Sequence, residues 1–121
     1  MKAMILAAGL GTRLKPETNH KPKGLINVFG KPMISLLIDR LTGYGYTTIV
    51  VNVHHHADML IHYLNKRHAD INLLISDERT QLLDTGGALK KAKDMLSGDA
   101  PVLVHNVDVL TDIDLHDLNK K

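Results

Sequence analysis

The sequence predicts an α/β fold with three layers, in which a mainly parallel, Rossmann-like sheet is covered by helices on both faces. Short aliphatic stretches alternate with segments of helical periodicity, and a glycine-rich turn directly follows the first stretch. This alternation is typical of chains in which parallel strands are joined by helices. The length of 121 residues corresponds to one domain at most.

The expected strands are short and almost continuously apolar, as are strands that are covered on both faces. They span residues 2–7, 48–53, 71–76 and 102–106.

The expected helices show apolar residues at a spacing of three and four. Pro32 starts the first helix, Gly43 and Gly45 end it, and Gly98 closes the third. The apolar positions are Ile34, Leu37, Ile38 and Leu41 in the first helix, Met59, Leu60, Tyr63 and Leu64 in the second, and Ala88, Leu89, Ala92 and Leu96 in the third.

Composition excludes several classes of protein. The formal net charge of +2 is too small to indicate a nucleic-acid partner. Without cysteine the chain has neither disulfides nor thiolate metal sites. Its apolar runs are too short for a membrane span, and its N-terminus lacks the features of a signal peptide. We therefore expect a cytoplasmic protein without membrane or nucleic-acid partners.

A glycine-rich turn follows the first expected strand and leads into a cationic segment. Gly9 and Gly11 allow the backbone to approach a ligand closely, and Arg13 and Lys23 supply positive charge. A P-loop is excluded because no Gly-Lys is followed by Ser or Thr, and Leu14 excludes the dinucleotide fingerprint. Taken alone, the two glycines are equally compatible with a tight connection between a strand and a helix.

The longer string over residues 9–23 resembles the signature of sugar-1-phosphate nucleotidyltransferases, which is Gly-x-Gly-Thr-Arg, then Pro-x-Thr, then Pro-Lys. The resemblance continues through Gly30-Lys31-Pro32-Met33, Thr85-Gly86-Gly87 and Asn106-Val107-Asp108. It implies transfer of a nucleotidyl group from GTP or UTP to a sugar 1-phosphate, with Mg²⁺ as cofactor. The chain looks most similar to mannose-1-phosphate guanylyltransferases, with N-acetylmuramate-1-phosphate uridylyltransferases as the alternative.

The resemblance also implies roles for individual residues. Gly9, Gly11, Thr12 and Arg13 would wrap the triphosphate, and Lys23 would lie near the reacting phosphates. Asp108 would bind the metal, so that Arg13, Lys23 and Asp108 are the catalytic candidates. The less favoured alternative is that Asp108 begins a turn or caps a helix, and Val107 stands where many relatives have glycine.

Contacts to the base are implied for the backbone around Ala7 and Ala8 and for the region that holds Glu78 and Gly86. A carboxylate can accept two hydrogen bonds from guanine but only one from uracil. Glu78 therefore favours GTP over UTP, unless it is an exposed loop acid. His54, His55 and His56 are adjacent and diverge, which makes them a poor tetrahedral metal site.

Residues 1–121 are thus expected to form the nucleotide-binding part of a domain that is incomplete at its C-terminus. In the family, a second metal-binding aspartate and most of the sugar pocket come from a later segment. We therefore expect the chain alone to lack turnover, and uncovered apolar surface or a free strand edge would allow it to form a homo-oligomer. A nucleotide-sensing module without catalysis is the alternative from another class.

Overall fold

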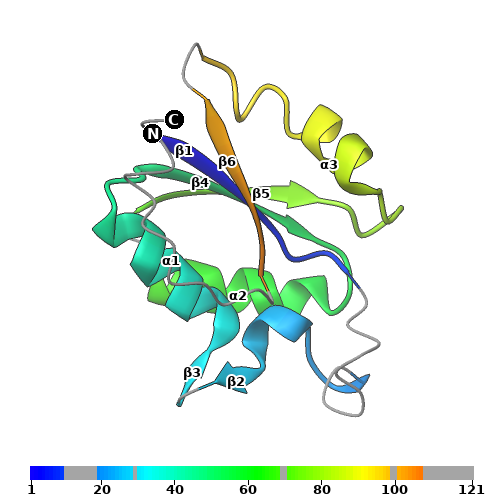
Figure 1. Ribbon diagram of the computed structural model, residues 1–121. Helices are drawn as coiled ribbons and strands as arrows, with labels where there is room; N and C mark the ends of the chain where they lie inside the picture. Colours follow the sequence, from blue (N-terminus) through cyan, green and yellow to red (C-terminus); the bar gives the residue numbers. More distant parts are fainter. Residues whose placement is uncertain (10–18, 29, 69–70, 99–100, 108–121) are drawn as a thin grey trace.

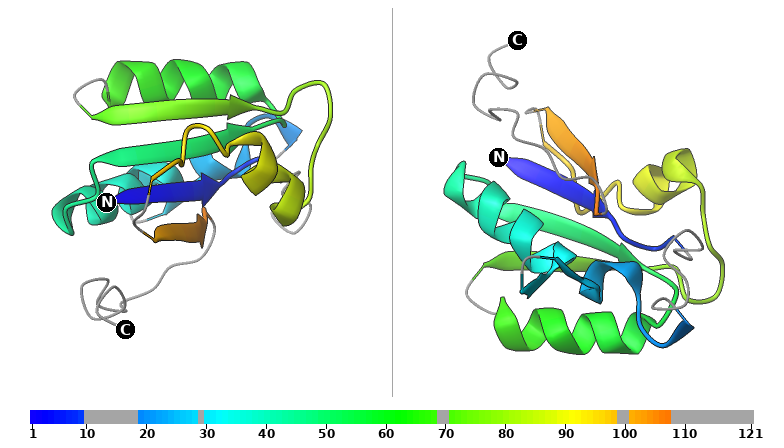
Figure 2. Two further views of the ribbon diagram at one scale, coloured as in Figure 1. Left: turned by 90° about the horizontal axis from the view of Figure 1, so that it is seen from above. Right: turned by 60° about the horizontal axis from the view of Figure 1, so that its bottom comes forward.

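The centre of the computed structural model, which describes residues 1–9, 19–28, 30–68, 71–98 and 101–107, is a parallel sheet of four strands. Its order is β5 (Asn72–Asp77), β4 (Thr48–Val53), β1 (Lys2–Leu6) and β6 (Val102–Asn106). The left view of Figure 2 shows this order almost edge-on, with β1 and β4 in the middle. The four predicted strands are confirmed to within one residue at each end.

Helices cover both faces of the sheet, as predicted. The helices α1 (Met33–Gly43) and α2 (Ala57–Arg67) lie on one face, and α3 (Thr85–Lys91) lies on the other (Figure 1). The chain moves outward from β1 to β4 and β5 on the α1 and α2 side. It then returns through α3 to place β6 on the far side of β1, in keeping with right-handed crossovers.

Each face of the sheet has its own apolar cluster. Ala3 and Ile5 of β1 belong to the larger cluster, beneath α1 and α2, whereas Met4 belongs to the smaller one, beneath α3. All three side chains are fully buried. This two-sided burial explains why the strands read as continuous apolar runs rather than as alternating ones.

The third helix is shorter than its periodicity predicts, since it ends at Lys91 and the chain continues in turns as far as Leu96. Its buried anchors, Ala88 and Ala92, are small and bury little apolar area. In the second helix, Met59 is 43% exposed although it fits the apolar spacing. None of the described helices has the length and apolar character that a membrane span requires.

A small substructure before α1 was not predicted from the sequence. It comprises the 3₁₀ turn η3 (Lys23–Leu25) and an antiparallel pair of β2 (Asn27–Val28) and β3 (Lys31–Pro32). The turn packs closely on the core, because a Cβ added to Gly24 would lie 3.5 Å from side-chain atoms of Ile34 and Val107. This packing holds Lys23 near the carboxyl ends of β1 and β6.

The strand order reverses between β1 and β6, because the chain leaves β1 towards β4 on one side and returns to β6 on the other. In open parallel sheets, ligands bind beyond the carboxyl ends of the strands at such a reversal. The topology therefore indicates where a functional site should lie.

The core of α2 generates a test of this packing. We expect Leu60→Ala to lower the free energy of unfolding by about 2–5 kcal/mol, because Leu60 is 1% exposed and its removal leaves a cavity. The neighbouring Met59→Ala should cost less than about 1 kcal/mol, since Met59 is largely exposed. Urea unfolding of both variants measures the difference, and equal losses would contradict the described orientation of α2.

Candidate functional site

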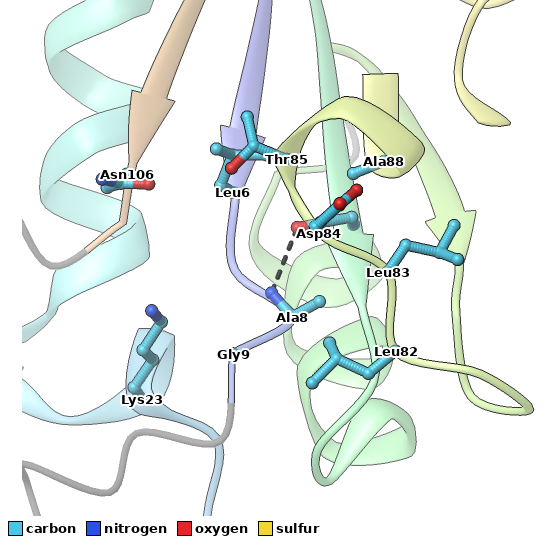
Figure 3. A pocket seen from close by; sticks show the side chains of 11 residues that line it. Leu6, Ala8, Gly9, Lys23, Leu82, Leu83, Asp84, Thr85, Ala88 and Asn106 are labelled. Atoms are coloured by element: carbon cyan, nitrogen blue, oxygen red, sulfur yellow. Dashed lines mark hydrogen bonds between the residues drawn. The ribbon is translucent and has the colours of Figure 1, made fainter. Parts of the chain in front are cut away.

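A cavity of about 320 Å³ lies at the reversal of strand order, beyond the carboxyl ends of β1 and β6. Figure 3 shows it between the turn at residues 8 and 9, with Lys23 beside it, and the segment 82–85 that leads into α3. The lining residues are Leu6, Ala8, Gly9, Lys23, Asn52, Leu82, Leu83, Asp84, Thr85, Ala88 and Asn106.

One wall combines a bare backbone turn with a cation. A Cβ added to Gly9 would lie 3.0 Å from Nζ of Lys23, so the ammonium group lies directly beside this glycine. The predicted site residues Ala8, Gly9 and Lys23 are therefore brought together. A positive charge next to an exposed main chain suits an anionic ligand such as a phosphate group.

The turn is fastened to the sheet by a residue that sequence reasoning missed. The Oδ1 atom of Asn52 accepts hydrogen bonds from the backbone N–H groups of Ala7 (2.6 Å) and Ala8 (3.1 Å). The bond to Ala8 is the dashed line in Figure 3. A polar residue within the apolar run Val50-Val51-Asn52-Val53 was the available signal. The backbone around Ala7 and Ala8 was expected to contact the base, and in this structure both N–H groups are bonded to Asn52.

Glu78 differs from its predicted role. Its side chain is fully buried, and it does not line the cavity. Oε2 accepts a hydrogen bond from Nδ2 of Asn52 (3.0 Å), and Oε1 accepts one from the backbone N–H of Leu83 (3.1 Å). The carboxylate therefore binds groups of the protein, and the argument from Glu78 for guanine over uracil is corrected. The error arose because strand pairing, which buries Glu78, is not visible in the local sequence.

The opposite wall depends on the start of α3. Asp84 caps this helix, because its Oδ1 atom accepts a hydrogen bond from the N–H of Gly87 (2.7 Å). A Cβ added to Gly87 would lie 3.0 Å from that oxygen and 3.2 Å from Cβ of Leu83, so a larger residue here would have to displace these neighbours by a few tenths of an ångström. The predicted site residue Gly86 lies beside Thr85, which lines the cavity, but does not itself line it.

The turn after β5 is fixed by an exposed ion-pair cluster. Nη2 of Arg79 lies 2.7 Å from Oδ2 of Asp77, and its Nη1 also pairs with Asp58 of α2. The side-chain and backbone hydrogen bonds from Arg79 lower the pKa of Asp77, and the same partner raises the pKa of Arg79. Because these groups are exposed, the cluster orients the turn more than it stabilises the fold.

The adjacent histidines take up structural contacts at the end of β4. Nδ1 of His54 donates a hydrogen bond to the carbonyl oxygen of Glu78 (2.6 Å), and Nε2 of His56 lies 3.3 Å from the carbonyl oxygen of Asn19. His56 adopts the left-handed conformation (φ 50°) and precedes α2. These contacts join the ends of β4 and β5 and the segment before η3.

The remaining predicted site residues, Gly11, Thr12, Arg13 and Asp108, lie outside the described residues. Val107, which directly precedes Asp108, is 1% exposed and donates its backbone N–H to the carbonyl oxygen of Leu6 (3.1 Å). Within the described part of the chain, no group of three or more His, Asp or Glu side chains could hold a metal ion.

Comparisons with known proteins bear on this site. The sequence profile of the nucleotidyl transferase family matches residues 2–121. The chain is 49% identical to N-acetylmuramate alpha-1-phosphate uridylyltransferase of Caulobacter vibrioides, over 88% of the chain and 45% of that protein. It is 39% identical to mannose-1-phosphate guanyltransferase of Emericella nidulans, over 93% of the chain and 31% of that protein.

Solved structures share the fold. The structure of HddC from Yersinia pseudotuberculosis superposes with a TM-score of 0.85 at 30% identity, over 98% of the chain and 52% of HddC. The chain spans about half the length of uridylyltransferases such as that of Caulobacter vibrioides and about a third of the length of guanyltransferases such as that of Emericella nidulans. Since the family profile covers almost all of the sequence, the chain belongs to the nucleotidyl transferase family.

Proposed function

We propose that the chain is the nucleotide-binding part of an enzyme that transfers a nucleotidyl group from a nucleoside triphosphate to a sugar 1-phosphate. The observation that carries this proposal is the cavity at the strand-order reversal, in which Lys23 lies against the bare backbone of Gly9. Membership of the family supports it, and so does the structure of HddC complexed with GMP-PN, which superposes with a TM-score of 0.84.

In the proposed reaction, an oxygen of the sugar phosphate attacks the α-phosphorus of the triphosphate in line. A new P–O bond forms as the bond to the β-phosphate oxygen breaks, and pyrophosphate leaves. Such a transfer requires alignment and charge neutralisation rather than a strong base. We assign the neutralisation to Lys23 and Arg13, and the wrapping of the phosphates to the backbone of Gly9, Gly11 and Thr12.

Mg²⁺ is the proposed cofactor, and Asp108 is its proposed ligand. A carboxylate oxygen is the kind of ligand that this ion prefers, and when bound the ion would neutralise phosphate charge. The anchored backbone at Val107 supports the assignment, because it brings the chain to the edge of the cavity directly before Asp108.

For the substrates we propose UTP and N-acetylmuramate 1-phosphate. Two uridylyltransferases of that name are 49% and 44% identical to the chain, and the burial of Glu78 removes the sequence argument for guanine. Transfer from GTP to mannose 1-phosphate is the second candidate, supported by guanyltransferases at 35–40% identity. Both reactions use small soluble substrates, so we place the protein in the cytoplasm.

Two further sequence-based hypotheses remain predictions. The first is self-association, which would occur at the edge of the described sheet formed by β6, where Val104 is 38% exposed. The second is a nucleotide-sensing module without catalysis, which would use the same cavity. Pyrophosphate release by a longer chain that includes these residues would separate catalysis from sensing.

The cavity predicts nucleotide binding by the chain itself. In calorimetric titrations with Mg²⁺ present, we expect UTP to bind at least about tenfold more tightly than GTP, a difference of about 1.4 kcal/mol. Tighter binding of GTP would reverse the substrate assignment. If folded protein binds neither nucleotide, the cavity is not a nucleotide site.

The position of Lys23 predicts a specific loss on its removal. Lys23→Ala should weaken triphosphate binding by about tenfold or more, because a charge-assisted contact to phosphate is lost. Lys21→Ala is the matched control, since Lys21 does not line the cavity, and it should change the dissociation constant by less than about twofold. If both variants weaken binding equally, Lys23 contributes only to the overall positive charge of the surface and makes no specific contact with phosphate.

The metal assignment predicts that Asp108→Asn abolishes the dependence of nucleotide affinity on Mg²⁺ and leaves the unfolding temperature unchanged. The amide keeps the volume of the side chain but removes the charge that holds the ion. Asp112→Asn serves as the control and should retain the dependence. Calorimetry with and without a chelator measures both, and an unchanged Mg²⁺ dependence in Asp108→Asn would show that the ligand lies elsewhere.

A further inference from the structure

A polar pair is buried where β4 and β5 end at the cavity: Asn52 lines the cavity, whereas Glu78 lies behind it. Asn52 is 4% exposed and Glu78 is fully buried, whereas the strand residues around them are mainly aliphatic. Burial of a carboxylate is costly unless hydrogen bonds replace the lost water. The arrangement of its partners therefore indicates what this pair does.

The pair connects the two walls of the cavity through consecutive hydrogen bonds. From the turn, the N–H groups of Ala7 and Ala8 donate to Oδ1 of Asn52. Nδ2 of Asn52 donates to Oε2 of Glu78, and Oε1 of Glu78 accepts from the N–H of Leu83 in the opposite wall. Ala8 and Leu83 both line the cavity, so its width is linked to the geometry of this pair.

The chemistry of each partner is specific. Asn52 must present an acceptor to two N–H groups and a donor to a carboxylate, which a carboxamide does and a carboxylate does not. Glu78 must accept on both oxygens, one from Asn52 and one from Leu83, which a carboxylate does and a carboxamide does not.

We propose that Asn52 and Glu78 are positioning residues that hold the glycine turn and the 82–85 wall at the separation a nucleotide requires. This inference rests on the proposed function, because it assigns the cavity to a nucleotide. The pair holds the walls through the backbone N–H groups of Ala7, Ala8 and Leu83, and of its two side chains Asn52 lines the cavity.

The donor and acceptor pattern allows a swap that separates this role from simple burial. In Glu78→Gln, the new NH2 group faces another donor, either Nδ2 of Asn52 or the N–H of Leu83. In Asn52→Asp, two carboxylates face each other without a donor between them. In the double variant, the new carboxylate at position 52 still accepts from Ala7 and Ala8. Its second oxygen accepts from the new carboxamide at position 78, whose oxygen accepts from Leu83. All the bonds are restored at the same net charge.

Calorimetry with Mg²⁺-UTP and Mg²⁺-GTP on the wild-type chain and these variants tests the proposal. For the nucleotide that the wild type binds, we expect each single variant to weaken affinity about tenfold or more. The double variant should return to within about threefold of the wild type. Ser76→Ala is the control, because Ser76 pairs in register with Asn52 and is buried, yet its Oγ has no hydrogen-bond partner among the described residues. It should leave affinity unchanged.

Amide hydrogen exchange provides a second readout that needs no nucleotide. Glu78→Gln should accelerate amide exchange at Ala8, which is linked to Glu78 by two successive hydrogen bonds through Asn52. The double variant should restore protection at Ala8. If the wild type binds no nucleotide, the proposed function fails, whereas exchange at Ala8 and Leu83 still decides whether the walls are linked. Two outcomes would overturn the proposal. In the first, the single variants lower the unfolding temperature but leave nucleotide affinity and the exchange at Ala8 unchanged. In the second, the double variant restores neither affinity nor protection from exchange.

Discussion

The fully buried side chain of Glu78 constrains the structure at this end of the sheet. Its two oxygens need hydrogen-bond donors in place of water in this apolar layer, and Asn52 and the backbone of Leu83 provide them. Asn52 in turn must satisfy its own acceptor, which it does with the turn after β1. One requirement, that a buried polar side chain finds hydrogen-bond partners, therefore holds together the ends of β1, β4 and β5 and the segment that leads into α3.

The sequence was sufficient for the sheet because its strands are apolar on both faces and the signal is local. In the structure β1 lies in the interior of the sheet, between β4 and β6. Lys23 was predictable as a site residue because a motif of fixed spacing identifies it. Those parts of the fold depend on patterns within a few residues, which a single sequence displays.

Glu78 and Asn52 were not predictable in the same way. Next to Asp77 and Arg79, Glu78 reads as one charged residue among several in a loop. Its burial results from the pairing of β4 with β5, in which Val53 lies opposite Asp77. Asn52 carried a signal, a polar side chain within an apolar strand, but its partners come from segments far along the chain. The early end of α3 was missed for a related reason, because the small size of Ala88 and Ala92 limits how firmly that helix is packed.

The reversal of strand order also determines when the site can form as the chain is synthesised. β1 pairs with β4, where Lys2 lies opposite Thr48, and with β6, where Lys2 lies opposite Val102. The pairing with β4 and β5 can begin once residue 77 has emerged, whereas the other flank of β1 must wait for β6, which ends at residue 106. Contacts of such long sequence separation form slowly. Until then β1 has an unpaired apolar edge, and a chaperone would have its greatest effect on yield in that interval.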